Sequence, residues 1–466
     1  MVFSSLTFLL FFFPVIGLLY FWVRNDRMRN GILLIASIGF YAFGEPKWVF
    51  VMLAMVLVNY LCALSISTAK NRKARTLFLI VGVVFSLGFL FYFKYASFFC
   101  NEVLRLVHST ARVKDIVLPV GISFYTFQIL TYIVDVYREK IPVQTNFFRL
   151  LLYVSFFPQL IAGPIVNYKD ISDSLAHRKE NESDYYDGFL RFIVGLSKKC
   201  LLANTCGEVV SELTTAGNSV AGAWLLAVCY SLQLYFDFSG YSDMAIGLGR
   251  MFGFSFKENF LHPYTADSIT DFWRRWHVSL GAFFREYVYI PLGGNRVGKL
   301  KWCRNLLIVW ALTGFWHGAS WNFVVWGLYY GVLLMLEKIF FLDIKKHIPK
   351  VFNIMMTLFL VIIGWVFFYF EKLSDGVTHI GKMFGAGKIP LTDATTVFQF
   401  KNKFGFVLLA LIACLPWNEW LGKMKRNGKF AAVWNVVSPV AALGLLLISV
   451  MLLVGQSFNP FLYFRF

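Results

Sequence analysis

Apolar windows of about 20 residues recur along most of the chain, and each is long enough for a helix to cross the hydrocarbon core of a membrane. Lipid offers backbone N–H and C=O groups no hydrogen-bond partner, so spanning segments must be helices or closed barrels. The pattern predicts an all-α integral membrane protein, a polytopic helical bundle of about 11–13 spans.

Composition supports this prediction. The 466 residues are 58% hydrophobic and 19% aromatic but only 15% charged, and mean hydropathy is +0.62, far above that of a soluble globular chain. The polar stretches are too short for a soluble domain, and no repeat is visible. We therefore expect a single membrane domain over residues 1–466, with N-terminal hairpin spans at 1–99, a core region at 113–341 and C-terminal spans at 351–466.

Basic clusters at Arg24–Arg29 and Lys70–Arg75 set the expected orientation. The first window, Leu6–Val23, has no basic region before it and no small-residue cleavage site after it, so we expect a retained span rather than a signal peptide. The positive-inside rule places both basic clusters in the cytoplasm and the N-terminus outside. The net charge of +18 then fits loops that meet anionic lipid headgroups, and no nucleic-acid partner is expected.

Three segments are too polar or too broken to face lipid. Residues 113–139 mix apolar runs with polar side chains, and Ser155–Pro164 holds two prolines and a glycine. Gln233–Asp243 carries Asp237 and Asp243 within apolar sequence. Intramembrane carboxylates are costly, and irregular backbone survives at membrane depth only where protein or water covers it. We expect these segments inside the bundle, with the carboxylates facing a cavity.

The block from His262 to Arg304 is amphipathic and too charged to span, which predicts interfacial or re-entrant helices on the cytoplasmic side. Ser268 precedes Asp271 by three residues in a capping-box pattern, so a helix should begin there and carry residues 273–280.

His317 is the most informative residue, because it stands inside an apolar segment. Helical spacing would place it on one small, polar face with Thr313, Gly314, Ser320 and Trp321. A buried neutral imidazole can accept a proton near neutrality and so act as a general base. A histidine that only hydrogen-bonds two helices together is the alternative that the residues alone leave open.

His277 follows Arg274 and Arg275 on the interfacial helix. A second active-site group and an interfacial histidine among solvated charges remain alternatives for it. The two arginines could hold the phosphates of a nucleotide-bearing donor through bidentate hydrogen bonds, or could bind lipid headgroups instead. The seven cysteines show no metal-ligand spacing, so neither a metal site nor a disulfide framework is expected.

Five stretches together resemble the membrane-bound O-acyltransferase family, in its bacterial branch that acetylates alginate and peptidoglycan and, more distantly, the teichoic-acid D-alanyl transfer proteins. They are Phe157–Pro164, Phe236–Gly247, Asp271–His277, Arg285–Arg296 and Gly314–Gly318. The resemblance implies that His317 is the family's catalytic histidine and that His277 corresponds to its upstream polar partner. It also implies a helical bundle around a central tunnel that joins a cytoplasmic donor site to an extracytoplasmic acceptor site.

The expected activity is therefore an O-acetyltransferase in a bacterial inner membrane. It would take an acetyl group from acetyl-CoA or a similar thioester, with His317 as general base and Arg274 and Arg275 at the donor phosphates, and with no permanently bound cofactor. The resemblance implies an acetylesterase-like partner outside the cytoplasm. A transporter that exports a glycan or acyl compound without chemistry, and a structural scaffold, are the rival hypotheses.

Overall fold

The computed structural model describes residues 1–178, 181–424, 426–455 and 462, and within these residues it contains helices and no strand. The chain forms two compact units, one comprising residues 1–192 and 244–257, the other residues 193–243 and 258–466. Each unit is described by itself. The all-helical class expected from the sequence is confirmed.

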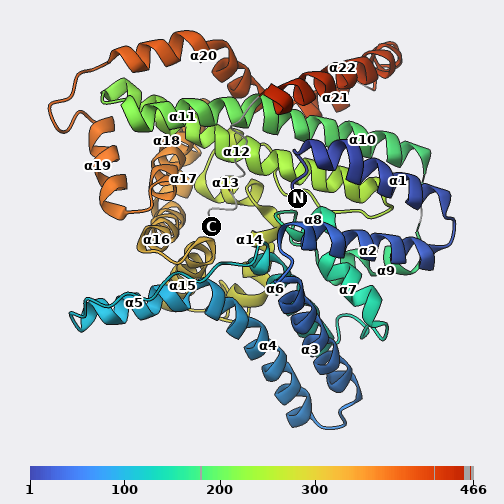
Figure 1. The fold of residues 1–466 in the computed structure, drawn as a ribbon. Coiled ribbons are helices and arrows are strands. Elements are labelled where there is room, and N and C mark those ends of the chain that lie inside the picture. Colours follow the sequence, from blue (N-terminus) through green and yellow to red (C-terminus); the bar gives the residue numbers. More distant parts are fainter. Residues whose placement is uncertain (179–180, 425, 456–461, 463–466) are drawn as a thin grey trace. The chain divides into compact units, whose positions relative to one another are not determined.

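The first unit holds helical hairpins followed by short, broken helices (Figure 1). Their bounds are a π-helical turn η1 Phe8–Phe12, α1 Phe13–Trp22, α2 Asp26–Gly44, α3 Val49–Thr68, α4 Arg72–Lys94, α5 Ala96–Leu106, α6 Ile122–Tyr137, α7 Phe147–Ser155, α8 Phe157–Leu160, α9 Tyr168–Ala176 and most of α10 Glu182–Ser197. Asparagine side chains cap several of them: the Asn71 side chain accepts from the N–H of Ala74 at the start of α4.

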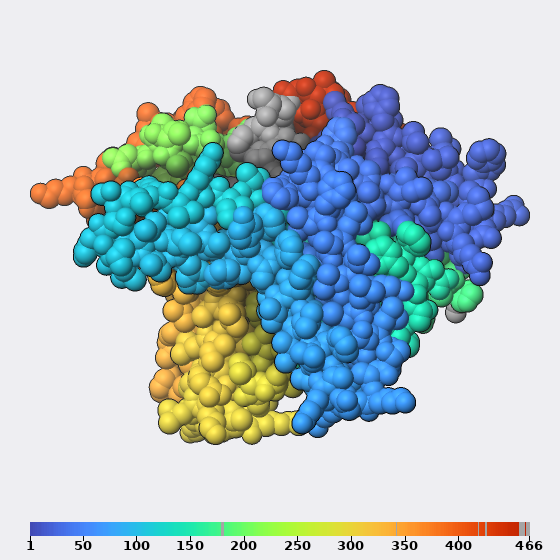
Figure 2. Space-filling view, turned by 60° about the horizontal axis from the view of Figure 1, so that its bottom comes forward, coloured from blue at the N-terminus to red at the C-terminus, as the bar shows by residue number. Residues whose placement is uncertain are grey.

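Helix α6 lies inside this unit, packed against α3 and α4. Its polar residues Thr126, Gln128 and Thr131 are fully buried, as expected for a segment too polar to face lipid. The outer faces of α3 and α4, blue in Figure 2, instead expose apolar side chains such as Leu61, Ile80 and Val84. The chain breaks between α7 and α8 at Phe156, and the whole segment is buried, which confirms the expectation for Ser155–Pro164.

The second unit begins with the end of α10 and carries the remaining helices, apart from residues 244–251 of α12, which belong to the first unit. Their bounds are a π-helical turn η2 Lys198–Ala203, α11 Asn204–Ala216, α12 Val220–Met251, η3 Pro263–Thr265, α13 Ile269–Arg275, α14 Val278–Phe284, η4 Arg285–Tyr289, α15 Lys299–His317, α16 Trp321–Leu336, η5 Glu337–Phe341, α17 Leu342–Lys345, α18 Lys350–Tyr369, α19 Leu373–Met383, α20 Ala394–Ala413, α21 Trp417–Met424 and α22 Gly428–Gly455. Its core is rich in aromatic side chains, among them Trp326, Tyr330 and Trp365.

Seven of the described helices are long and apolar enough to cross a membrane, by length and composition, where the apolar windows suggested about 11–13 crossings. The difference has local causes. Helix α6 is only 16 residues long, the α7–α8 segment is broken, and α2 and α15 begin with charged turns. A window of apolar sequence is therefore not always one continuous apolar helix.

Candidate functional site

Two glycines bring α15 and α16 into close contact, and this hairpin positions His317. A Cβ added at Gly314 would lie 2.1 Å from the carbonyl oxygen of Phe323, and one added at Gly327 would lie 2.2 Å from that of Trp310. Real Cβ atoms essentially never approach so closely, so only glycine permits this backbone approach. Figure 1 shows the two helices side by side.

His317 is the last residue of α15, and its ring is buried. Three aromatic rings surround it, with centroids 4.9 Å (Trp316), 5.1 Å (Trp326) and 5.1 Å (Phe368) from the imidazole. The expectation of one continuous polar face is wrong beyond His317. Gly318 is extended, Ser320 is the N-cap of α16, and Trp321 is exposed, because the helix ends where the hairpin turns.

His277 lies at a break between two helices, not within one. The Ser268 side chain caps α13 as expected, accepting from the N–H of Asp271 at 3.1 Å. The helix does not continue through residues 273–280, however. It ends at Arg275, Trp276 is extended, and His277 has a φ of 47° before α14 begins.

Backbone hydrogen bonds from residues 259–261 stabilise this break. The Leu261 N–H donates to the carbonyl of Arg275, and the Val278 N–H donates to that of Asn259, at 2.9 and 3.0 Å. These bonds replace the helical bonds that the break removes.

The hydrogen bonds of His277 fix its tautomer. Asn259 Oδ1 accepts from the Ser279 N–H at 3.1 Å, so this atom must be the amide oxygen. It lies 3.3 Å from His277 Nδ1, which therefore carries the proton. Burial lowers the pKa of His277 to about 3, so the ring is neutral. Its Nε2 has no hydrogen-bond partner among the described residues and is left as an acceptor.

Both histidines contact the same indole ring. The Trp316 centroid lies 5.9 Å from that of His277 and 4.9 Å from that of His317. The sequence separates the histidines by 40 positions, and the break at Trp276 is what turns His277 towards α15. The structure thus brings the two predicted catalytic residues to one aromatic cluster.

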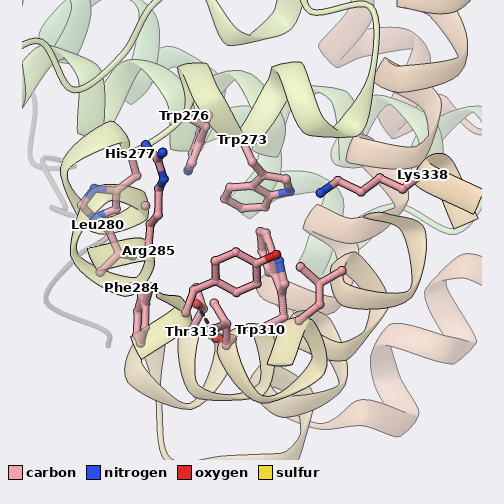
Figure 3. Close-up of a pocket in the computed structure, with 13 residues that line it drawn as sticks. Trp273, Trp276, His277, Leu280, Phe284, Arg285, Trp310, Thr313 and Lys338 are labelled. Carbon is pink, nitrogen blue, oxygen red and sulfur yellow. Dashed lines mark hydrogen bonds between the residues drawn. The ribbon is translucent and has the colours of Figure 1, made fainter. Parts of the chain in front are cut away.

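A cavity of about 220 Å³ lies beside His277 (Figure 3). Its walls are largely apolar, with Trp273, Trp276 and Trp310 among them, and the polar groups include His277, Thr313, Arg285 and Lys338. Thr313 lies one helical turn before His317 on α15, so the cavity reaches the residues next to that histidine. An apolar cavity with a few convergent polar groups is the usual form of a small-molecule site.

The arginines expected at a donor site do not line this cavity. Arg275 forms a fork-to-fork ion pair with Asp271, with N–O distances of 3.0 and 2.8 Å, and donates a further bond to Thr265. Arg274 is exposed. The cations that do line the cavity are Arg285 and Lys338. Their meeting in one cavity was not predicted, because they lie 53 positions apart in sequence and only the fold brings them together.

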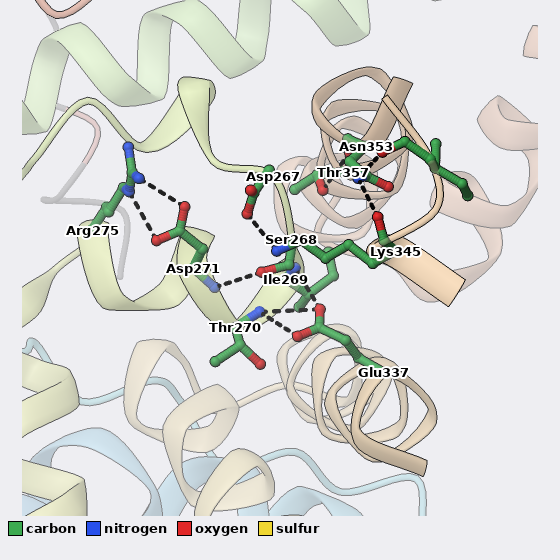
Figure 4. Close-up of polar contacts among 11 residues, drawn as sticks. Asp267, Ser268, Ile269, Thr270, Asp271, Arg275, Glu337, Lys345, Asn353 and Thr357 are labelled. Atoms are coloured by element: carbon green, nitrogen blue, oxygen red, sulfur yellow. Dashed lines mark hydrogen bonds and ion pairs between the residues drawn. The ribbon is translucent and has the colours of Figure 1, made fainter. Parts of the chain in front are cut away.

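Helix α13, which carries Trp273 into the cavity, is anchored at its N-terminus (Figure 4). The buried carboxylate of Glu337 accepts from the N–H of Ile269 at 2.7 Å and from that of Thr270 at 3.2 Å. Lys345 pairs with Asp267 just before the helix, at 2.6 Å. A carboxylate at a helix N-terminus satisfies free N–H groups and opposes the helix dipole. Nothing in the sequence near Glu337 indicates this role.

The two intramembrane carboxylates of α12 each form an ion pair with a lysine. Asp237 pairs with Lys199 and Asp243 with Lys198, both at 2.6 Å. The Asp237–Lys199 pair is almost fully buried. The π-helical turn η2 supplies both lysines. The lysines and the aspartates lie too far apart in sequence to be paired from the pattern alone. Among the described residues, no three His, Cys, Asp or Glu side chains gather as metal ligands.

The helices form a multi-pass membrane protein with two buried histidines against one indole ring, and comparison with known families identifies its class. The model of the membrane-bound O-acyltransferase family matches residues 137–374, which include both histidines and the cavity. The chain belongs to this family and is an O-acyltransferase.

Relatives of known description match the whole chain or a large part of it. The "Probable alginate O-acetylase" of Pseudomonas putida is 37% identical over the whole of both chains. The "Peptidoglycan O-acetyltransferase" of Helicobacter pylori is 34% identical over 84% of this chain and 81% of its own. The "Teichoic acid D-alanyltransferase" of Bacillus subtilis is 30% identical over 54% of this chain and 66% of its own. The sequence resemblance is confirmed, with the D-alanyl branch more distant.

Proposed function

We propose that this chain moves an acetyl group from a cytoplasmic thioester, acetyl-CoA, across a bacterial inner membrane to O-acetylate an extracytoplasmic glycan of the alginate or peptidoglycan type. The names of the alginate and peptidoglycan relatives support the acetyl group and the glycan. Family membership makes the chain an enzyme, which removes the reason to prefer a transporter or a scaffold.

The observation that carries the chemistry is the pair of buried imidazoles in contact with Trp316. His317 acts as general base. It takes the proton of the acceptor hydroxyl while the hydroxyl oxygen attacks the thioester carbonyl, the carbon–sulfur bond breaks, and the thiolate leaves and is protonated. The aromatic rings around His317 keep water from hydrolysing the acyl group.

His277 supplies a second, fixed acceptor. Its proton is held on Nδ1 by Asn259, so Nε2 can accept a hydrogen bond from a group entering the cavity. Because the ring stays neutral, its contribution is to orient the reacting groups rather than to carry charge.

The cavity beside His277 is the proposed donor site. Arg285 and Lys338 would bind the phosphates of the CoA nucleotide, and the tryptophan walls would pack against its apolar parts. Arg274 and Arg275 were expected in that role. The structure favours Arg285 and Lys338 over them, since neither arginine lines the cavity and the Arg275 guanidinium is already paired with Asp271. An acetylesterase-like partner outside the cytoplasm is part of the proposal: it can receive the acetyl group and pass it to the glycan.

Labelled acetyl transfer in proteoliposomes tests this function. With [¹⁴C]acetyl-CoA outside and acceptor glycan inside, with and without a co-purified partner, His317→Gln should lower turnover by about 10²- to 10⁴-fold, because glutamine keeps hydrogen bonding but cannot take a proton. The exposed His347 gives the matched control, and His347→Gln should transfer normally. Near wild-type turnover of a well-folded His317→Gln protein would remove the base from the mechanism.

A further inference from the structure

A second hollow, of about 260 Å³, lies in the same unit between the turn that joins α11 to α12 and the helix α19. Unlike the donor cavity, it is lined by polar and apolar groups in about equal measure. The polar groups on the α11–α12 side include Thr214, Asn218 and Ser219, and those on α19 are Asp375, Thr378, His379 and Lys382.

The polar groups of α19 form one face of that helix. Positions 375, 378, 379 and 382 follow the spacing that places side chains on a common side of an α-helix. Together they offer a carboxylate, a hydroxyl, an imidazole and an ammonium group, which include both hydrogen-bond donors and acceptors.

His379 contributes an acceptor to this set. Its Nε2 lies 3.1 Å from the carbonyl oxygen of Ala223, so Nε2 must donate. Burial lowers the pKa of His379, which keeps the ring neutral and leaves Nδ1 without a proton.

The opposite wall is held rigidly. The Asn218 N–H donates to Asp393 Oδ2 at 2.9 Å, and the Val220 N–H donates to the carbonyl of Pro390 at 3.1 Å. A Cβ at Gly222 would lie 2.5 Å from Thr396 Oγ1, so α12 and α20 approach closely there. The hollow is therefore preformed by backbone bonds and close packing, as ligand pockets usually are.

The end of α18 carries one residue that lines the hollow and another that contacts His317. Phe370 lines it, and the Phe370 carbonyl accepts from Asn322 Nδ2 at 2.7 Å. Phe368, two residues earlier, lies 5.1 Å from the His317 ring. This is the end of α18 away from its basic start at Lys350, which the positive-inside rule assigns to the extracytoplasmic side.

We propose that this hollow binds a sugar unit of the acceptor glycan, so that the chain itself holds the acceptor at the end of α18. The proposal rests on the proposed function. A sugar presents several hydroxyls, each a donor and an acceptor, and the mixed groups of α19 and of the α11–α12 turn match that requirement. Phe370, Leu213 and Leu226 cover part of the lining with apolar surface for the face of a sugar ring.

Direct binding to the purified protein in nanodiscs tests the proposal without requiring catalysis. The probes are a tetramer of mannuronate and a GlcNAc–MurNAc tetrasaccharide, measured by calorimetry. Asp375→Asn on α19 and Asn218→Ala on the opposite wall should each weaken Kd about tenfold or more, since each removes hydrogen bonds to hydroxyls. Lys382→Ala should weaken the binding of both probes, because mannuronate and MurNAc each carry a carboxylate that the ammonium can pair with.

Lys372→Ala is the matched control, because Lys372 is an exposed lysine at the N-cap of the same helix and does not line the hollow. In transfer assays the hollow variants should raise the KM for glycan and leave the KM for acetyl-CoA unchanged. Wild-type protein that transfers acetyl groups but binds neither probe, or binds them equally well in folded Asp375→Asn and Asn218→Ala, overturns the sugar site alone. Binding that these variants weaken, in a protein that transfers no acetyl group, would instead reject the proposed function.

Discussion

At the scale of single residues, His277 shows how a short backbone irregularity prepares a side chain. The left-handed conformation at His277 ends one helix and begins another, and it brings the imidazole against Asn259 and Trp316. A continuous helix would have carried the ring elsewhere. Non-glycine residues seldom adopt this conformation, and such positions cluster where function requires them.

His277→Asn should reduce acetyl transfer, but less than His317→Gln does. Asparagine keeps a polar group in the cavity but moves its acceptor, so we expect a loss of about 10- to 100-fold in kcat. Because the pKa of His277 is about 3, the wild-type ring does not titrate near neutrality. Any inflection of the rate between pH 6 and 8 should therefore persist in His277→Asn, and its disappearance from the pH profile would show that His277 is the titrating group.

The cations of the donor cavity give a prediction about binding. Arg285→Gln and Lys338→Gln should each raise the KM for acetyl-CoA about tenfold or more, because each removes a charge-assisted hydrogen bond to phosphate. Arg274→Gln should change it little, since Arg274 does not line the cavity. Initial rates at varied acetyl-CoA concentrations measure these KM values. A large effect of Arg274→Gln alone would place the phosphate site at Arg274, as expected from the sequence.

At the scale of elements, the α15–α16 hairpin depends on close contact between backbones. Gly314→Ala should destabilise the protein by about 1–3 kcal/mol and displace His317, because the new methyl group would overlap the carbonyl of Phe323. Gly405→Ala in α20 is the matched control, since nothing lies within 4 Å of that position, and it should be neutral or slightly stabilising. Thermal unfolding in detergent measures both, and equal midpoints would contradict the packing argument.

The sequence predicted elements well where the signal was local and poorly where it was not. Ser268 capped α13 as its pattern indicated, and the break around Phe156 followed from the prolines near it. The break at Trp276 has no proline or glycine to mark it and depends on bonds from residues 259–261. The same holds for Glu337, which caps a helix that begins 68 residues earlier.

The candidate site divides in the same way. His317 and His277 could be singled out from their surroundings and from the family motifs, and the fold brings both to Trp316. Arg285 and Lys338 could not be paired from sequence, because they reach one cavity from different helical segments. Arg275 looked available for a phosphate only while its bond to Asp271, one helical turn away, was unknown.

At the scale of the whole molecule, charge should set the topology. Cysteines placed singly at Lys70 or Arg27 in a cysteine-free protein should resist an impermeant maleimide in intact cells, because these basic loops are expected in the cytoplasm. A cysteine at Ala386, beyond α19, should react, since that end of α18 is expected outside. Labelling before and after permeabilisation gives the comparison, and the opposite pattern would invert the orientation of both proposed sites.

The buried ion pair between Lys199 and Asp237 bears on how the chain enters its membrane during synthesis. Placing either charge alone at the centre of a bilayer costs roughly 2.5–3.5 kcal/mol on insertion scales. Lys199 lies in η2 and Asp237 in α12, with α11 between them, and their side chains meet at 2.6 Å. Insertion is therefore more favourable when η2, α11 and α12 enter the lipid together, with Lys199 and Asp237 already paired, than when each helix enters alone. This requires that Asp237 has emerged from the ribosome first.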